Sequence, residues 1–157
     1  MFAAVPASMR EKLDDYSGFH QTFGNELCHY LGIPSIVAGS ATLLGLVRIA
    51  TFGGYTLTLA EVIGAAIGIY YLVSARLLGL ATTLLFAALI ALGRALPLWL
   101  GLTIFIGGWV LQFVGHLAFE HRSPAFLRNL VHLLVGPAWI VERALKRLGG
   151  EQKPELS

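Results

Sequence analysis

The chain has 157 residues, of which 56% are hydrophobic and 13% are charged, and its formal net charge is +2. Soluble domains carry about 25% charged residues, whereas apolar runs of about 20 residues, long enough to cross a bilayer, recur along this sequence. The composition excludes an ordinary soluble domain and a disordered chain. The single cysteine, Cys28, excludes a disulfide-stapled module, and the small, scattered charge excludes nucleic-acid binding.

The first 32 residues are not expected to cross a membrane. Residues 1–15 are mixed and charged and lack the apolar core of a signal peptide, so we expect an uncleaved cytoplasmic segment. Residues 16–32 are polar and aromatic, with interruptions at Gly18 and Gly24. They predict a short helix that lies near the membrane interface.

Two spanning helices are expected next. The first covers about residues 34–52, with Pro34 at its N1 position, and a Gly-Gly-Tyr turn at residues 53–55 ends it. The second begins near Thr58, because Thr58 and Glu61 have the spacing of a capping box. This role places Glu61 in the first helical turn and removes most of its functional interest.

Two further spans and a shorter apolar segment complete the predicted fold. The third span covers about residues 77–93, and the fourth covers 97–119, with Trp99 as an interfacial anchor. Residues 130–141 are too short to span and predict an interfacial or re-entrant helix. We expect an all-α, polytopic membrane bundle of about four spans with interfacial N- and C-terminal helical segments. The membrane domain covers residues 16–148, and 149–157 form a disordered tail.

The charges of the loops predict an orientation. With four spans, the side of the termini holds nine basic residues: Arg10, Lys12, Arg76, Arg122, Arg128, Arg143, Lys146, Arg147 and Lys153. The other side holds only Arg48 and Arg94. The positive-inside rule therefore places both termini in the cytoplasm. A composition rich in Ala, Leu and Arg and poor in Lys favours a bacterial inner membrane, or the endoplasmic reticulum for a eukaryotic source.

The positions of the histidines are the informative feature of the sequence. None of the five lies in the first three spans: His20, His29, His116, His121 and His132. The predicted topology brings their segments to one side of the membrane, where they can meet in a polar pocket. At helical spacing Asn25 shares a face with His29, and His116 shares a face with Gln112 and Glu120. Imidazole and carboxylate groups at this spacing can bind a metal directly or support its ligands.

His20 and His29 need a break in the chain before they can share a metal. Nine residues place them on opposite faces of an unbroken helix, about 13 Å apart along it. Either Gly24 interrupts the helix, or His20 lies in the turn that precedes it. A lone histidine at a membrane surface is more often a hydrogen-bonding residue than a ligand. His116 is a stronger candidate because ionisable groups in apolar spans usually face an interior site, whereas His121 is interpreted as a solvated loop residue.

Two blocks of residues resemble a known family. The first is His20-x4-Asn25-x3-His29-x2-Gly32-Ile33-Pro34, and the second is Gly115-His116-x2-Phe119-Glu120-x3-Pro124-Ala125, followed by Asn129 and Gly136-Pro137. In this order, about ninety residues apart and flanking apolar spans, they resemble the Mpo1-like family (DUF962). The resemblance covers roughly residues 16–144.

The resemblance implies an iron(II)-dependent dioxygenase of fatty acid α-oxidation. Its substrates are a long-chain 2-hydroxy fatty acid and O2, and its product is the fatty acid one carbon shorter. The implied iron ligands are His20, His29 and His116; His132 is a fourth candidate that is not obligatory, since a family member carries glutamine there. Glu120, Asn25 and Asn129 are assigned to the surroundings of the metal or to the substrate. Arg122 or Arg128 is expected to steer the carboxylate, and membrane lipid is the expected environment.

Other functions stay open at this point. A desaturase-like lipid oxidase is disfavoured because the HxxxH and HxxHH boxes of those enzymes are absent. A carrier would place polar ligands near mid-membrane, and the first three spans lack them. A non-enzymatic membrane protein that binds metal, or whose histidines only form hydrogen bonds, is the remaining alternative. The oligomeric state does not follow from the sequence.

Overall fold

The computed structural model describes residues 5–127 and 129–149, and this part of the chain is mainly helical. Its elements, in chain order, are α1 (Ala7–Gly18), α2 (Phe23–Leu44), β1 (Arg48–Phe52), β2 (Tyr55–Thr58), α3 (Leu59–Ala95), α4 (Leu98–Val114), the π-helical turn η1 (Gly115–Phe119), the 3-10 turn η2 (Ala125–Leu127) and α5 (His132–Leu148). The predicted all-α class is confirmed, with one small antiparallel hairpin in addition. Arg128, Lys153 and the rest of the expected tail beyond Gly149 lie outside the described residues.

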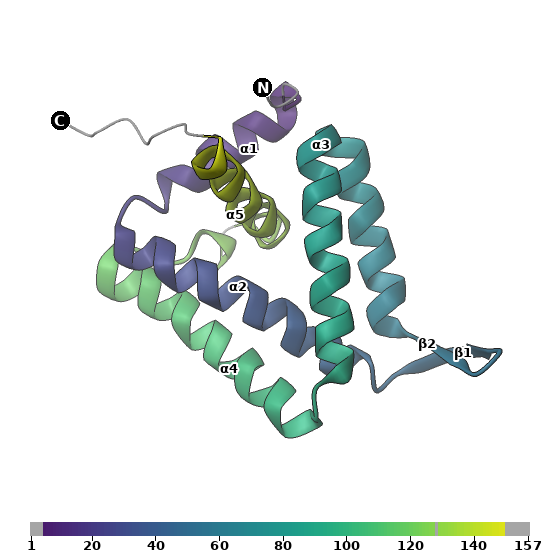
Figure 1. The fold of residues 1–157 in the computed structure, drawn as a ribbon. Coiled ribbons are helices and arrows are strands. Elements are labelled where there is room, and N and C mark those ends of the chain that lie inside the picture. The colour runs from purple at the N-terminus through teal and green to yellow at the C-terminus, as the bar shows by residue number, and fades with distance from the viewer. Residues whose placement is uncertain (1–4, 128, 150–157) are drawn as a thin grey trace.

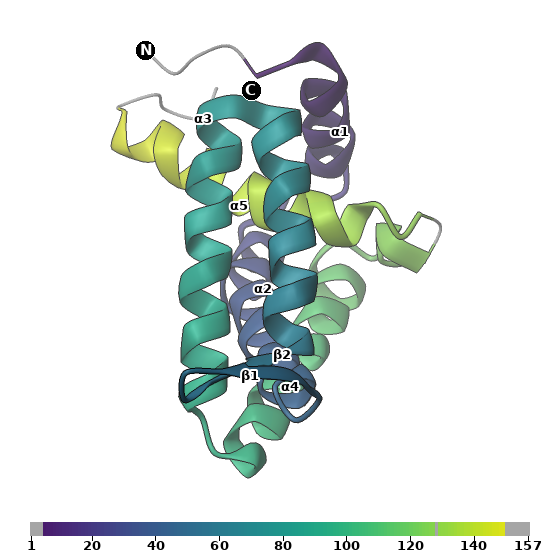
Figure 2. The same ribbon diagram turned by 90° about the vertical axis from the view of Figure 1, so that its right-hand side faces the viewer.

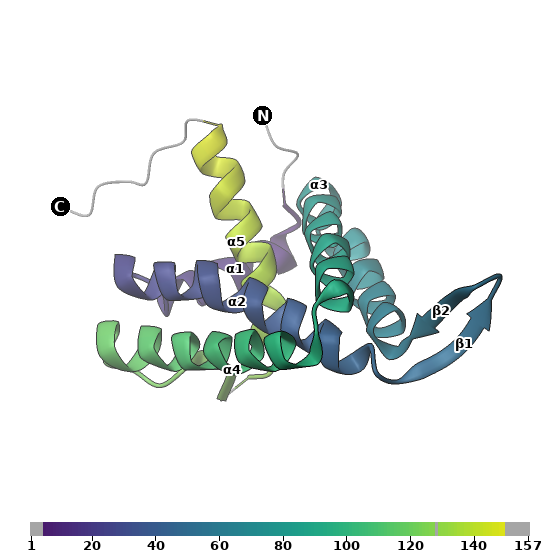
Figure 3. The same ribbon diagram turned by 60° about the horizontal axis from the view of Figure 1, so that its bottom comes forward.

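The helices form a bundle in which α2 and α4 run side by side in opposite directions (Figures 1 and 3). The two arms of α3 stand against this pair, and α5 crosses behind them (Figure 2). α2 and α4 approach closely because glycines face each other: a Cβ on Gly108 would lie 2.8 Å from the carbonyl oxygen of Gly32. Small residues at a helix interface allow this approach in membrane proteins.

α3 is a helical hairpin. Arg76 has a φ of 47°, so the chain reverses there and the two arms lie side by side (Figure 1). Gly79 is required at the bend, since a Cβ at this position would lie 2.0 Å from the carbonyl oxygen of Tyr71. The expected second and third spans are therefore the two arms of this hairpin. The predicted capping box is confirmed, because the Glu61 carboxylate accepts the backbone N–H of Thr58 at 2.9 Å.

The predicted bounds of the first span are wrong. α2 begins at Phe23 rather than at Pro34, which lies inside the helix, and it ends at Leu44. The first turns of α2 are polar, but they do not lie exposed at an interface: Asn25, Glu26 and His29 are all buried. Partners on other elements contact two of these side chains: Glu120 accepts from Asn25 Nδ2, and Arg143 of α5 binds Glu26. A polar stretch can therefore belong to a long, otherwise apolar helix.

The expected Gly-Gly turn does not end a helix either. Gly53 (φ 51°) and Gly54 (φ 86°) connect β1 to β2. Positive φ at both central residues is typical of the two-residue turns that close β-hairpins, and glycine adopts it without strain. The residues between Leu44 and Thr58 therefore form a hairpin beyond the helix (Figure 1).

Three helices among the described residues are long and apolar enough to cross a membrane: Phe23–Leu44, Leu59–Ala95 and Leu98–Phe119. They are compatible with a membrane protein. α5 is shorter and amphipathic, and it packs back on the bundle against α1, α2 and α3.

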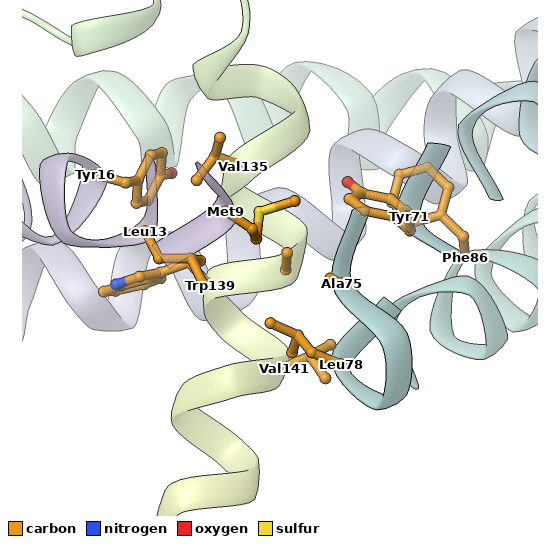
Figure 4. Close-up of a cluster of buried hydrophobic side chains, with 11 residues drawn as sticks. Met9, Leu13, Tyr16, Tyr71, Ala75, Leu78, Phe86, Val135, Trp139 and Val141 are labelled. Atoms are coloured by element: carbon orange, nitrogen blue, oxygen red, sulfur yellow. The ribbon is translucent and has the colours of Figure 1, made fainter. Parts of the chain in front are cut away.

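The hydrophobic core centres on α5, between α1 and the hairpin of α3 (Figure 4). Trp139 of α5 is fully buried beside Tyr16, and its Nε1 donates to Ser17 Oγ at 2.9 Å. On the other side of α5, Tyr71 donates to the carbonyl oxygen of Leu134 at 2.5 Å. The first contact fixes α5 against α1 near the point where the chain enters α2, and the second fixes α5 against α3.

Candidate metal centre

The turn between α1 and α2 brings His20 against His29. Residues 19–22 leave the helical path, and α2 begins after Thr22, whose side chain caps the helix by accepting the backbone N–H of Asn25. Glu120 fixes this turn from the other end of the sequence, because its Oε1 accepts the backbone N–H groups of Gln21 at 2.6 Å and Thr22 at 2.7 Å. The break therefore lies before the helix and not at Gly24.

Three of the predicted ligands form one buried group. His20, His29 and His116 are each at most 2% exposed. Each offers one ring nitrogen, and these atoms lie within 4.8 Å of one another. The rings of His20 and His29 have centroids 4.2 Å apart, and both lie within 5 Å of the ring of His116. Residues separated by 96 positions in the sequence thus meet at one point inside the bundle.

The hydrogen bonds of His20 and His29 determine which nitrogens are free. Nδ1 of His20 lies 2.6 Å from the carbonyl oxygen of Tyr16, and Nδ1 of His29 lies 2.9 Å from that of Asn25. A carbonyl oxygen only accepts, so both Nδ1 atoms carry the proton and both neutral rings have a bare Nε2. Histidines that bind metals usually donate their second nitrogen in this way.

The two bare nitrogens face each other. His20 Nε2 and His29 Nε2 lie 2.9 Å apart in a buried site. Two lone pairs at this distance repel unless a proton or a metal ion lies beside them. The arrangement of His20, His29 and His116 is thus one that could hold a metal ion, and three neutral imidazoles suit iron, zinc or copper while leaving positions open for other ligands.

His116 reaches this group from the irregular end of α4. Gly115–Phe119 form a π-helical turn, a feature often found at functional sites. Gly115 allows the approach to α2, since a Cβ there would lie 2.4 Å from Oδ1 of Asn25. Within the described part of the chain, His116 Nδ1 is buried without a hydrogen-bond partner. Because of the π-turn, Glu120 does not continue the helix face of Gln112 and His116 that the sequence predicted. Its carboxylate instead contacts the turn before α2.

Burial keeps the ring of His20 neutral, whereas the carboxylate of Glu120 is ionised. Burial, and then the neighbouring His29, lower the pKa of His20 to about 2, so its ring is neutral at physiological pH. Burial by itself raises the pKa of Glu120, but the N–H groups of Thr22 and Gln21 donate to the carboxylate and lower the pKa below its usual value. Glu120 is therefore ionised, and it stabilises the turn that carries His20.

His132 lies beside the three-histidine group without joining it. Its Nε2 is 3.0 Å from Oδ2 of Asp15, and its buried Nδ1 has no partner among the described residues. The ring lies 5.8 Å from that of Tyr16. His132 thus faces the same site as the expected ligands but pairs with a carboxylate of α1.

A cavity of about 250 Å3 opens from the histidines. One end is polar and is formed by His20, His29, His116, His132 and Gln112. Nε2 of Gln112 is buried and has no hydrogen-bond partner in the described structure. The other end is lined by apolar side chains, among them Ile33, Ile36 and Val37 of α2. The cavity therefore combines a polar head with an apolar body.

Several expected site residues lie elsewhere. Asn25 is fully buried and donates from Nδ2 to the carbonyl oxygen of Phe19 at 3.1 Å and to Glu120 at 3.3 Å, so it supports the turn of His20. Asn129 is exposed, and its Oδ1 accepts the backbone N–H of Val131. His121 and Arg122 are also exposed, as expected for a solvated loop, and the structure brings none of these three to the cavity.

The sequence did not indicate two aromatic residues that shape the site. Tyr16 stacks on His20 with centroids 4.1 Å apart, and Trp139 lies 5.2 Å from the same ring. The spacing Tyr16-x3-His20 is a signal that could have shown the first contact, since four residues make one helical turn. The contact with Trp139 depends on the packing of α5 on α1, for which the sequence offers no local signal.

A second missed feature is a buried ion pair behind the site. Glu26 is 2% exposed, and its carboxylate binds Arg143 at 2.7 Å and Arg147 at 3.4 Å. This interaction connects the first turn of α2 to α5. The end of α2 that carries His29 is thereby held to the helix that carries His132.

Comparison with known proteins shows the family of the chain. Residues 6–148 match the sequence model of the family described as Mpo1-like, 2-hydroxy-palmitic acid dioxygenase Mpo1-like. The chain belongs to the Mpo1-like family. It is also 34% identical over 142 residues to the 2-hydroxy-palmitic acid dioxygenase MPO1 of Saccharomyces cerevisiae, covering 90% of this chain and 82% of the yeast protein.

The resemblance that the two sequence blocks indicated is thus confirmed. No solved structure matches the chain significantly. The homology supports a function related to the 2-hydroxy fatty acid dioxygenases of the Mpo1-like family. The three buried histidines lie in the two sequence blocks that resemble the family, one block around the beginning of α2 and the other at the end of α4.

Proposed function

We propose that the protein is an iron(II)-dependent dioxygenase that converts a long-chain 2-hydroxy fatty acid to the fatty acid one carbon shorter. The observation that carries this proposal is the pair of bare Nε2 atoms of His20 and His29, which face each other beside His116 in a buried site. The yeast relative is named for 2-hydroxy-palmitic acid, which suggests the class of substrate.

The chain's own residues would hold the metal and keep its surroundings fixed. Ferrous iron at His20, His29 and His116 would supply the redox chemistry and the open coordination positions that this reaction needs. The carbonyl oxygens of Tyr16 and Asn25 fix the orientation of two of the rings. Glu120 and Asn25 do not face the cavity but hold the turn that carries His20, so we assign them a positioning role.

The polar end of the cavity suits the head of a 2-hydroxy acid. Gln112 Nε2 is a donor without a partner, and His132 Nδ1 is a second buried atom without one in the described structure. Asp15 binds the opposite nitrogen of His132 and fixes the direction of that ring. These two side chains can bind the carboxylate or the 2-hydroxyl group, while the apolar body of the cavity excludes water.

The overall transformation needs no reductant. One balanced form consumes one molecule of O2 for each 2-hydroxy acid and releases the shortened acid, CO2 and water. The hydroxyl-bearing carbon becomes the new carboxyl carbon, the bond to the old carboxyl group breaks, and O2 accepts the electrons. The role of the protein is therefore to hold the 2-hydroxy carboxylate next to the metal in a site without bulk water.

We further propose that the bundle lies in a membrane, a bacterial inner membrane or the endoplasmic reticulum, with both termini cytoplasmic. The end with α1, α5 and the histidines then faces the cytoplasm. In sealed vesicles, an impermeant thiol reagent added to the cytoplasmic side should label Leu148→Cys and leave Thr51→Cys unlabelled. Both positions are exposed, and the native Cys28 is buried. The opposite labelling would overturn this orientation.

Purified protein tests the metal and the enzyme together. Wild-type protein should contain iron and consume a 2-hydroxy fatty acid in air but not under nitrogen. His116→Ala should lose both the iron and the activity. A protein that keeps iron and converts no 2-hydroxy acid of any length would favour the non-enzymatic alternative, a membrane metal-binding protein. Full activity after complete removal of iron would contradict the proposal.

A further inference from the structure

The cavity below the histidines continues into a second one. The second cavity has a volume of about 260 Å3 and shares four lining residues with the first: Ile36, Val37, Ser40 and Leu133. Two cavities bordered by the same side chains are neighbours along α2. Together they form a path that begins at the histidines and leads into the centre of the bundle.

The chemistry of the walls changes along this path. Its beginning carries the four histidines and Gln112, whereas the second cavity is lined almost wholly by apolar residues, with Leu44, Ile63, Ile67 and Phe86 at the far end. The path follows α2 from Ile33 to Leu44, a rise of about 16 Å along the helix. A long path with one polar end and apolar walls has the shape and polarity of an extended fatty acid.

The far end of this path is closed by a close contact in α3. Gly64 and Ile90, from the two arms of the hairpin, both border the second cavity, and a Cβ on Gly64 would lie 2.2 Å from Cδ1 of Ile90. On the other side of this contact lies a more open hollow of about 720 Å3 between the arms of α3. Gly64 and Ile90 border both spaces, and their contact separates the path from this hollow, which borders none of the histidines.

We propose that these two cavities form the binding channel for the acyl chain, with the carboxylate end at the histidines and the methyl end between Ile63, Ile67 and Phe86. This inference rests on the proposed function, since it assumes a substrate with a 2-hydroxy carboxylate and a long acyl tail. Its new content is the position of the tail inside the bundle, between α2, α3 and α5, rather than in the surrounding lipid. The channel then sets the chain length that the protein accepts.

The position of Val37 makes the proposal testable by substitution. Val37 borders both cavities, so Val37→Phe should block the junction and stop longer chains while short chains still fit. Leu44 borders only the second cavity, so Leu44→Trp should reject only the longest chains. Val73 of α3 is 80% exposed and borders neither cavity, which makes Val73→Phe the matched control.

The first measurement is kcat/KM for a series of 2-hydroxy acids from octanoate to stearate. For wild type and Val73→Phe, kcat/KM should rise with chain length to the same optimum. Val37→Phe should move the optimum to shorter chains and lower kcat/KM for the longest ones at least about tenfold. Leu44→Trp should accept a maximum chain length between those of Val37→Phe and wild type. An equal loss on every chain length in both variants, or no change in either, would overturn the channel.

A second measurement does not depend on turnover. A 2-hydroxypalmitate analogue with a diazirine at its terminal carbon is activated by light in the intact protein, and the labelled residues are identified by mass spectrometry. Labelling of Ile63, Ile67 or Phe86 that Val37→Phe abolishes supports the channel. Labelling confined to outer residues such as Val73 overturns it. Labelling inside the channel by a wild-type protein without dioxygenase activity would support the channel and contradict the proposed function.

Discussion

The Nε2 atoms of His20 and His29 face each other at 2.9 Å although the Nδ1 atoms of both rings donate to backbone carbonyls. Neither ring in its neutral form has a proton to place between the two nitrogens. Burial lowers the pKa of His20 to about 2, so protonating this ring at neutral pH to relieve the repulsion is unfavourable. We therefore infer that a cation shared with His116 would relieve the repulsion between the two facing nitrogens.

Substitution of any ligand should therefore remove the metal. We expect His29→Ala and His116→Ala to lower the iron content of purified protein at least about tenfold, because two imidazoles hold a divalent metal much less tightly than three. The number of iron atoms per chain is measured by inductively coupled plasma mass spectrometry. His121 is exposed and borders no part of the cavity, so His121→Ala should keep the wild-type iron content. Normal iron in His29→Ala would show that the ligand set is wrong.

His132 should behave differently from the three ligands. Its ring faces the cavity but is held by Asp15, so His132→Ala should keep its iron while turnover of a 2-hydroxy acid falls by about 10–100-fold, the usual effect of losing a residue beside a metal site. Asp15→Asn should lower turnover less, since the imidazole of His132 is still present. Iron content and kcat are measured on the same preparations. Loss of iron in His132→Ala would instead make this residue a fourth ligand.

Glu120 should stabilise the protein in a manner that depends on pH. Its pKa is lower in the folded protein than the usual 4.5. The stabilisation from its charge is therefore fully present above pH 4.5 and is lost as the pH falls through the folded pKa. At neutral pH we expect Glu120→Gln to lower the free energy of unfolding by about 1–2 kcal/mol, since hydrogen bonds to a charged group are weakened.

The pH profile separates this role from a general loss of packing. Unfolding of wild type and Glu120→Gln in detergent should differ most at neutral pH, and the difference should shrink in more acidic solution. A difference that stays constant down to about pH 3 would contradict a stabilising charge at Glu120. The variant should also bind iron more weakly, by about tenfold, because the turn that carries His20 is less fixed.

Two glycines of the same long helix offer a matched pair. A Cβ on Gly115 would lie 2.4 Å from Asn25 Oδ1 and 3.0 Å from Cys28 Cβ, whereas one on Gly107 would meet nothing within 4 Å. Gly115→Ala should push the end of α4 away from α2, cost about 1–3 kcal/mol of stability and lower the iron content. Gly107→Ala should be neutral or stabilise by about 0.5–1 kcal/mol. Equal effects of the two substitutions on stability and iron would contradict the close approach at Gly115.

The sequence was sufficient for features that depend on local spacing or on hydrophobic length. The capping box of Thr58 and Glu61, the helix that ends near Phe119 and the exposed loop at His121 follow from short patterns, and each is present. The gathering of His20 with other histidines followed from a simple topology, in which the segments before and after the spans share one side. The structure brings His20, His29 and His116 together, a contact that this topology allows.

Features that depend on tertiary partners were not predictable in the same way. The polar beginning of α2 appeared too hydrophilic to be part of a long apolar helix, because its partners, such as Arg143 for Glu26 and the site for His29, lie over 80 residues away in sequence. Likewise, a π-helical turn lies between His116 and Glu120, where the sequence predicted the four-residue spacing of a regular α-helix. No local pattern distinguishes these cases, since contacts from other helices decide them.

The most direct test of the account is the incubation of purified protein with 2-hydroxypalmitate in air, with detection of the acid products by mass spectrometry. The account predicts pentadecanoate as the product, O2 consumed in equal amount, and loss of the reaction when iron is removed, with recovery on addition of iron(II). Unchanged 2-hydroxypalmitate after incubation with iron-loaded protein, or the same conversion by His116→Ala, would contradict it.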